Sequence, residues 1–198
     1  MFVDYITLLL INMVAGYFLL SAYVATGLDD PLNKRWAPGF SIVGLIAFVL
    51  GLHMTVTWPV IGQYSSAFGE MSVLFGVVFM GAALAIARGW SLASVTVFAF
   101  FAGAAAIVLG FRIIELRMTQ VPMLAGVGFI LSGLAGVFAA PTLLYLRANR
   151  PYRALAALVL LAPAAIWAFI GYHAYWHHME SFAGWVPLAM RGAAGPLQ

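Results

Sequence analysis

The histidines and acidic residues are the side chains of this 198-residue sequence that could do chemistry. His173 and His177 are four residues apart and Glu180 follows three residues later, so a helix would carry all three on one face. One helix supplies two or more metal ligands with this spacing. Imidazole suits Zn, Cu, Fe and Ni, and carboxylates widen the choice of metal.

Two further residues complete a predicted metal site. His53 lies about fifteen residues into an apolar segment, roughly 22 Å along a helix, and Glu70 opens the next one. We predict that the metal ligands are His53, Glu70, His173 and His177, with Zn, Fe and Cu not distinguished. A haem held between His53 and His173 is a second reading. The structural alternatives are a neutral histidine bonded to a backbone carbonyl and a first-turn acid favoured by the helix dipole.

Other ionisable residues are expected to support this site. Glu70 or Glu115 would act as the general base, and the additional carboxylates would allow two metal ions. Arg112, three residues before Glu115, either orients a ligand carboxylate or forms an ordinary ion pair on its helix. Asp4 would accept a hydrogen bond from a ligand imidazole, or it is an exposed terminal acid. Glu180 is assigned a supporting position.

His178 is interpreted differently from the other histidines. It lies about 100° around the helix from His177. We therefore expect an interfacial residue that joins Trp176 and Trp185 in an aromatic belt.

Composition places this chemistry in a membrane. Hydrophobic residues make up 65% of the chain and charged residues 8%, whereas soluble domains have about 25% charged residues. The chain has no cysteine, which excludes disulfides, thiolate metal sites and cysteine nucleophiles. The net charge of +3 is small, so nucleic acid is not an expected partner.

Apolar segments of about 20 residues are long enough to span a bilayer. Six qualify: Tyr5–Gly27, Pro38–Trp58, Glu70–Arg88, Ser91–Leu116, Val121–Leu146 and Tyr152–Trp176. We predict an all-α polytopic membrane protein, a bundle of about six transmembrane helices in a single domain over residues 1–198. The first segment has no basic n-region, so we expect it to remain as a span rather than act as a signal peptide. Pro141 and Pro163 lie inside the last two segments and are expected to kink them.

Basic residues predict the orientation. Six of the nine lie in the loops after the first, third and fifth segments, and Arg112, Arg117 and Arg191 lie on the other side. The positive-inside rule then places both termini outside the cytoplasm. In this topology eight ionisable residues fall at the outer ends of five helices, namely Asp4, His53, Glu70, Glu115, His173, His177, His178 and Glu180. Because intramembrane charges usually pair or do work, we predict a shared site facing the periplasm or exterior.

Small residues recur every four positions at Gly128, Ser132, Gly136 and Ala140. This ladder lets another helix approach closely. It indicates plain helix packing or, as the alternative, a functional groove, and it also fits a subunit of a larger membrane complex.

Two resemblances follow from these residues. The opening MFVDYITLLLINMVAGYFLLSAYV and the run GLHMTVTWPVIGQYSSAFGEMSVLFG at 51–76 resemble a family of small bacterial and archaeal integral membrane proteins of unknown function. The resemblance implies an all-helical fold in the cytoplasmic (inner) membrane of a prokaryote. The ligand arrangement is similar to the alkaline ceramidase and adiponectin-receptor type of membrane zinc hydrolase. That likeness implies His53, His173 and His177 as zinc ligands with Glu70 at the acidic position, although those families have seven spans and Ser41 is not at their serine spacing.

Three functions remain open from the sequence. The first is a metal-dependent membrane enzyme, either a hydrolase of a lipid-like amide or ester or an oxidoreductase acting on a membrane-soluble substrate. The second is a proton or metal-ion transporter, which the few polar residues of the inner half disfavour. The third is a structural or cofactor-holding subunit of a larger membrane complex.

Overall fold

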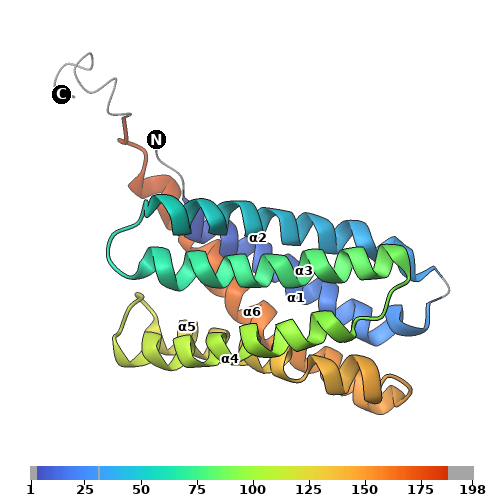
Figure 1. Cartoon of the computed structure of the whole chain (residues 1–198). Coiled ribbons are helices and arrows are strands. Elements are labelled where there is room, and N and C mark those ends of the chain that lie inside the picture. Colours follow the sequence, from blue (N-terminus) through green and yellow to red (C-terminus); the bar gives the residue numbers. More distant parts are fainter. Residues whose placement is uncertain (1–3, 31, 187–198) are drawn as a thin grey trace.

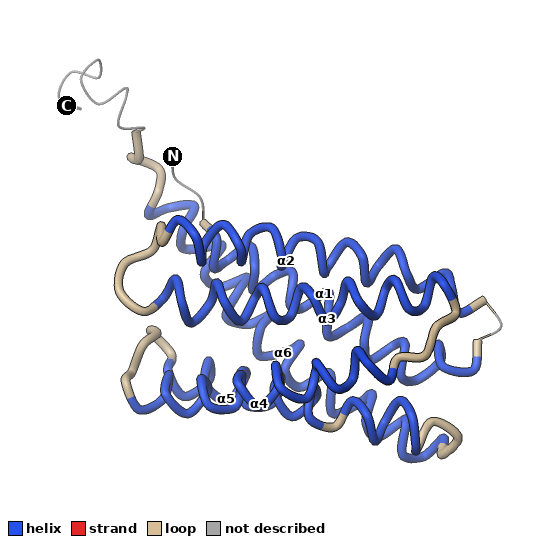
Figure 2. The backbone as a smooth tube through the Cα atoms, viewed as in Figure 1, coloured by secondary structure: helices blue, strands red, loops and turns tan. Residues whose placement is uncertain are grey.

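The structure is a computed structural model that describes residues 4–30 and 32–186. Every regular element in this part of the chain is helical (Figures 1 and 2). The six α-helices are α1 (Tyr5–Thr26), α2 (Ala37–Thr57), α3 (Met71–Arg88), α4 (Ala93–Glu115), α5 (Pro122–Val137) and α6 (Arg150–Ser181). Short 3₁₀ turns η1 (Gly27–Asp29) and η2 (Asn33–Trp36) join α1 to α2, and π-helical turns η3 (Ser65–Glu70) and η4 (Pro141–Tyr145) precede α3 and follow α5.

The predicted fifth span does not form one helix. Among the described residues, five helices are long and apolar enough to cross a membrane, while Pro122–Val137 is shorter. The expected segment Val121–Leu146 divides because Pro141 has no N–H to continue the α-helical ladder. The backbone passes into the π-helical turn η4 there, and the Thr142 hydroxyl donates to the Phe138 carbonyl at 2.7 Å. The prediction of about six membrane-spanning helices is therefore confirmed only in part. The described chain contains several helices that are long and apolar enough to cross a membrane, and α5 is shorter than these.

Helix α6 is longer than predicted. Its 32 residues replace the expected Tyr152–Trp176, because the Asn149 side chain accepts from the Tyr152 N–H at 3.1 Å at the start and Pro151 is tolerated in the first turn. Pro163 lies inside α6 without ending it. At 1.5 Å per residue the helix is about 48 Å long, which exceeds the roughly 30 Å hydrocarbon core. His173, His177 and His178 consequently lie on one continuous helix.

Glycines bring two pairs of helices close together. A Cβ at Gly76 of α3 would lie 2.5 Å from the backbone nitrogen of Phe48 on α2. A Cβ at Gly133 of α5 would lie 2.4 Å from the carbonyl oxygen of Gly103 on α4. Real Cβ atoms do not approach backbone atoms this closely, so α2 packs on α3, and α4 on α5, only because these residues are glycine.

Helix α1 lies between α2 and α6. The Asn12 side-chain N–H donates to the Val43 carbonyl of α2 at 2.9 Å. On its other side the Ser21 hydroxyl donates to the Ala157 carbonyl of α6 at 2.7 Å. Both bonds satisfy polar groups inside an apolar bundle, where an unpaired group is costly.

The bundle has two chemically different ends. Helices α1, α3 and α5 begin, and α2, α4 and α6 end, at the same end of the bundle (Figure 1). We name this the histidine end, because His53 lies near the end of α2 and the other three histidines lie near the end of α6. The opposite end, between α1 and α2 and between η4 and α6, is named the arginine end for Arg147, Arg150 and Arg153. Arg191, which the orientation prediction places on the same side as Arg112 and Arg117, lies outside the described residues.

Candidate functional site

The predicted ligand His53 bonds to neighbouring side chains at the histidine end. The Tyr5 hydroxyl lies 2.8 Å from its Nδ1, and the Thr57 Oγ1 lies 3.2 Å from the same atom. The Tyr5 and His53 rings stack with centroids 5.4 Å apart. His53 is exposed on the surface of α2, so its ring is not directed into a pocket shared with α6.

The predicted pair His173 and His177 does share one face of α6. Their ring centroids are 4.4 Å apart, and Phe169 stacks on His173 from the preceding turn at 5.8 Å. Both imidazoles and the Glu180 carboxylate are exposed. The one-face prediction is therefore confirmed for the two histidines.

The predicted carboxylates lie apart from these histidines. Glu70 is exposed and closes the π-helical turn η3, rather than opening an α-helix as expected. Glu115 pairs with Arg112 across 2.5 Å, and both side chains are more than half exposed. The ordinary ion pair, the structural alternative for these two residues, is the arrangement observed.

Residues 4–30 and 32–186 contain no group of three or more His, Asp or Glu side chains placed to hold a metal ion. The physical reason is the position of α1, which packs between α2, the carrier of His53, and α6, the carrier of His173 and His177. Ionisable residues do gather at one end of the bundle, but no three of the described His, Asp and Glu side chains converge on one point. A metal site of His53, Glu70, His173 and His177, and a haem on two of them, stay predictions.

His178 and Asp4 form the closest polar contact of the histidine end. The Asp4 Oδ2 lies 2.5 Å from the His178 Nδ1, and the Thr7 Oγ1 lies 3.1 Å from the same nitrogen. The sequence predicts an interfacial belt position for His178, but in the structure its ring links α6 to α1. The expected role of Asp4 as an acceptor for an imidazole is seen with His178, not with His173 or His177. No sequence signal indicates a pair 174 residues apart.

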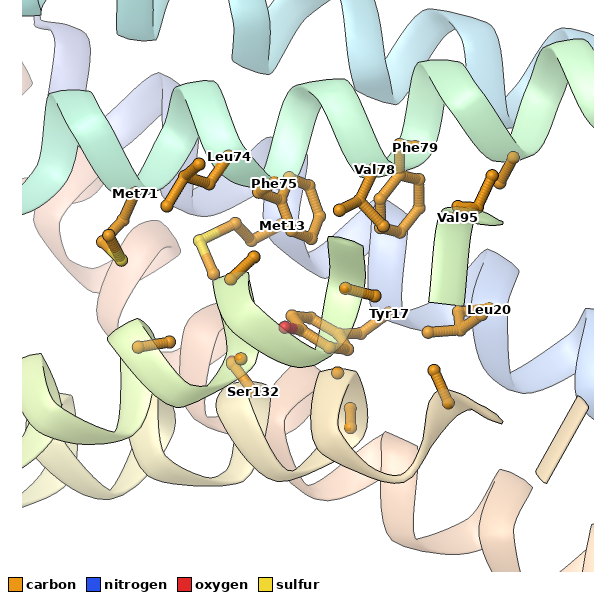
Figure 3. Close-up of a pocket in the computed structure, with 18 of the residues that line it drawn as sticks. Met13, Tyr17, Leu20, Met71, Leu74, Phe75, Val78, Phe79, Val95 and Ser132 are labelled. Atoms are coloured by element: carbon orange, nitrogen blue, oxygen red, sulfur yellow. The ribbon is translucent and has the colours of Figure 1, made fainter. Parts of the chain in front are cut away.

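A cavity between the helices is the second candidate, and sequence reasoning missed it. It has a volume of about 130 Å³ and lies among α1, α3, α4 and α5 (Figure 3). Its walls are mostly apolar and include Leu9, Met13, Tyr17, Leu20, Tyr23, Phe40, Phe68, Met71, Phe75, Phe79, Ile86, Leu92, Ala102, Phe129, Ser132 and Leu143. The lining residues of α1 run from Leu9 to Tyr23, and these two residues are about 21 Å apart along the helix axis. The cavity is therefore elongated along the bundle.

Few polar groups face this cavity, and they are connected to each other. The Tyr17 hydroxyl is directed toward Ser132 (Figure 3), and the Ser132 oxygen accepts a hydrogen bond from Trp167 Nε1 at 3.0 Å. Trp167 is fully buried and packs edge-on against Phe129, which also lines the cavity. The small-residue ladder explains this arrangement in part, because a Cβ at Gly128 would meet the Trp167 ring at 2.9 Å.

These features define the class of protein. The chain is an all-helical bundle with several helices apolar and long enough to cross a membrane, many exposed large apolar side chains and an apolar cavity between helices.

The particular family follows from comparison with known proteins. The chain belongs to the family described as "Protein of unknown function (DUF981)", whose model matches residues 1–181. No curated protein and no solved structure matches the chain. Membership confirms the predicted likeness to a family of unknown function. The likeness to ceramidase and adiponectin-receptor hydrolases has no support from these comparisons.

Proposed function

We propose that this chain is a multi-pass membrane protein that binds a membrane-soluble, mostly apolar molecule in the cavity between α1, α3, α4 and α5. The observation that carries the proposal is the cavity itself. Ligand sites are typically apolar hollows with a few polar groups that fix orientation. Tyr17 and Ser132 are such groups halfway along the helices.

The cavity is more than loose packing of the whole bundle. Its neighbouring contacts, α2 with α3 and α4 with α5, are closed by glycines to backbone distance. Apolar cavities of about 150 Å³ stay free of water and bind small apolar molecules. Flexible Met13 and Met71 side chains lie in the wall and can rearrange around a ligand.

The membrane placement is also part of the proposal. By the positive-inside rule the arginine end faces the cytoplasm and the histidine end faces outward, in the inner membrane of a prokaryote. The bilayer then supplies the ligand directly, because an apolar molecule in the hydrocarbon core is already at the depth of the cavity.

Binding of tritiated hexan-1-ol, which matches the volume of the cavity, to immobilised protein, read by scintillation proximity in detergent, tests the proposal. Wild type is expected to bind saturably with one site per chain. Ala102→Phe fills the cavity and should weaken binding at least tenfold. Val97→Phe places the same ring on the exposed face of the same helix and should leave binding unchanged. Non-saturable uptake, or equal binding by both variants, would contradict a ligand cavity.

A metal-dependent enzyme is a second proposal, favoured by one observation, the paired rings of His173 and His177. These would supply two ligands for Zn, Fe or Cu. Elemental analysis of the purified protein should then find a stoichiometric transition metal that His177→Ala removes. Metal-free protein of full stability would overturn this second proposal and leave the first untouched.

A further inference from the structure

The polar groups at the middle of the cavity come from Tyr17, Ser132 and Trp167. Tyr17 is 4% exposed, and its hydroxyl is directed into the cavity toward Ser132 (Figure 3). Ser132 is also buried, and its oxygen accepts the indole hydrogen of Trp167 at 3.0 Å. These side chains have three hydrogens to donate, one on the indole nitrogen and one on each hydroxyl. The acceptors available for these hydrogens decide what the cavity binds.

This group of three side chains has one hydrogen more than it can use internally. The Trp167 hydrogen goes to the Ser132 oxygen. A bond between the Ser132 and Tyr17 hydroxyls uses one more hydrogen, whichever of the two donates. One hydroxyl hydrogen is therefore left over, and it faces the cavity because both residues line it.

Other hydroxyls on these helices use their hydrogen on their own backbone. Thr142 donates to the carbonyl four residues earlier at 2.7 Å. Thr96, which also lines the cavity, donates to the carbonyl three residues earlier at 2.8 Å. Ser132 makes no such bond within residues 4–30 and 32–186, where its hydrogen-bond partner at 3.0 Å is Trp167 of α6. The helix backbone therefore does not take up the remaining hydrogen.

A buried donor without an acceptor is unfavourable, whereas an oxygen with an unused lone pair is tolerated more often. A ligand oxygen that accepts the remaining hydrogen would remove this cost. The ligand is also expected to be uncharged, because the described residues of the wall include no Asp, Glu, Lys, Arg or His and an ion buried there would have no counter-charge. The cavity is thus complementary to a neutral molecule with an acceptor oxygen.

We propose that the cavity binds a small, uncharged carbonyl compound, a ketone or an ester, whose oxygen accepts a hydrogen bond from the Tyr17 hydroxyl. This inference rests on the proposed function and names the chemical class of its ligand. With the carbonyl in place, Trp167 donates to Ser132, Ser132 to Tyr17 and Tyr17 to the ligand, so every hydrogen is used. The volume of about 130 Å³ limits the ligand to a small molecule. Apolar residues line the cavity on both sides of Tyr17, so the carbonyl lies within the molecule and not at its tip.

The test compares hexan-3-one with 2-ethylpent-1-ene, a hydrocarbon of the same shape in which a CH₂ group replaces the carbonyl oxygen. Both compete with tritiated hexan-1-ol in the proximity assay, and the ratio of their inhibition constants cancels any change in the affinity of the tracer. Wild type should bind the ketone about tenfold more tightly, because a buried donor gains its acceptor. Equal inhibition would show that the hydroxyls need no acceptor from a ligand. It would overturn the carbonyl assignment and leave the apolar cavity standing.

Two variants test the assignment to Tyr17. Tyr17→Phe keeps the ring and removes the donor, and Ser132 can then donate to a carbonyl of its own helix. Ketone and hydrocarbon should inhibit this variant equally. Thr96→Val removes a hydroxyl of the same wall whose hydrogen is already used, and it should keep the ketone preference. A Tyr17→Phe protein that retains the preference, or equal losses in both variants, would overturn the role of Tyr17. Absence of saturable hexan-1-ol binding to wild type would remove the proposed function, and the carbonyl assignment with it.

Discussion

Helix α3 makes two contacts of opposite character. Toward α2 it presents Gly76 opposite Gly44, and the backbones touch at van der Waals distance. Toward the cavity it presents Phe75, Val78 and Phe79, which line the space between α3, α1 and α4 instead of closing it. The two contacts lie on the same helix, so helix propensity does not explain the difference.

The difference shows what sets helix spacing in this bundle. Lipid is as apolar as the side chains, so helices associate through close packing and not through the hydrophobic effect. Glycine on both helices permits contact along the backbones. At the cavity, α3 contributes large aromatic rings, and α4 contributes Ala99, Ala102 and Gly103. The rings keep the helix backbones apart, and the small side chains of α4 do not fill the space that results. A cavity remains.

The largest expected effect comes from disturbing the close contact. Gly76→Ala places a Cβ 2.5 Å from the Phe48 nitrogen and 2.8 Å from the Gly44 carbonyl oxygen. Backbone atoms cannot move aside, so we expect a destabilisation of about 3 kcal/mol. Gly81→Ala on the same helix meets only Val95 at 3.5 Å and should change stability little. Unfolding in mixed micelles measures both, and equal effects would show that glycine packing does not distinguish the two contacts.

A smaller effect is expected where η1, the turn that follows α1, contacts α6 through the ion pair of Asp29 and Arg153. Asp29→Asn leaves the charge of Arg153, whose side chain is 6% exposed, without its partner. Breaking a fully buried pair costs about 3–5 kcal/mol. Because Asp29 is half exposed, we expect about 2 kcal/mol. Asp30→Asn is the control, since its partner Arg35 is 61% exposed. If the Asp29→Asn protein is as stable as wild type, solvent already compensates the charge of Arg153.

The smallest effect concerns the support of the cavity wall. Trp167→Phe removes the hydrogen bond to Ser132 and keeps most of the ring contact with Phe129. Hydrogen bonds between membrane helices contribute about 0.6–1.7 kcal/mol, so a loss of about 1 kcal/mol is expected. Trp176→Phe, at a position 78% exposed, should have no effect on unfolding. If both variants behave alike, the Ser132 contact does not hold the wall.

Part of the candidate site could be predicted from residue types and spacing. His173 and His177 share a face because four residues make about one turn of any helix, and the Arg112–Glu115 contact follows from a spacing of three. The contact of His178 with Asp4 could not be predicted, because it depends on how α6 crosses α1. The separation of His53 from His173 also depends on packing, namely on the insertion of α1 between their helices.

The fold shows the same division. Composition predicted apolar helices, and the Gly128–Ala140 ladder predicted close packing, which Gly128 and Gly136 make with Trp167 and with Ala99 and Gly103. The break at Pro141 was expected as a kink, but its extent was not, because the surrounding carbonyls could be satisfied in several ways. The cavity could not be predicted from the sequence, because the residues of its wall have the same types and the same helical spacing as the residues of an ordinary packed core.

The amino-acid sequence alone determined that this protein is helical and apolar, with its histidines and most acids at one end and most arginines at the other. Those properties follow from local periodicity and from the preference of charge for helix ends. Only the tertiary structure decided which charged groups meet and where space is left between helices. Both depend on side-chain shape at contacts between residues distant in the chain, which no local pattern specifies.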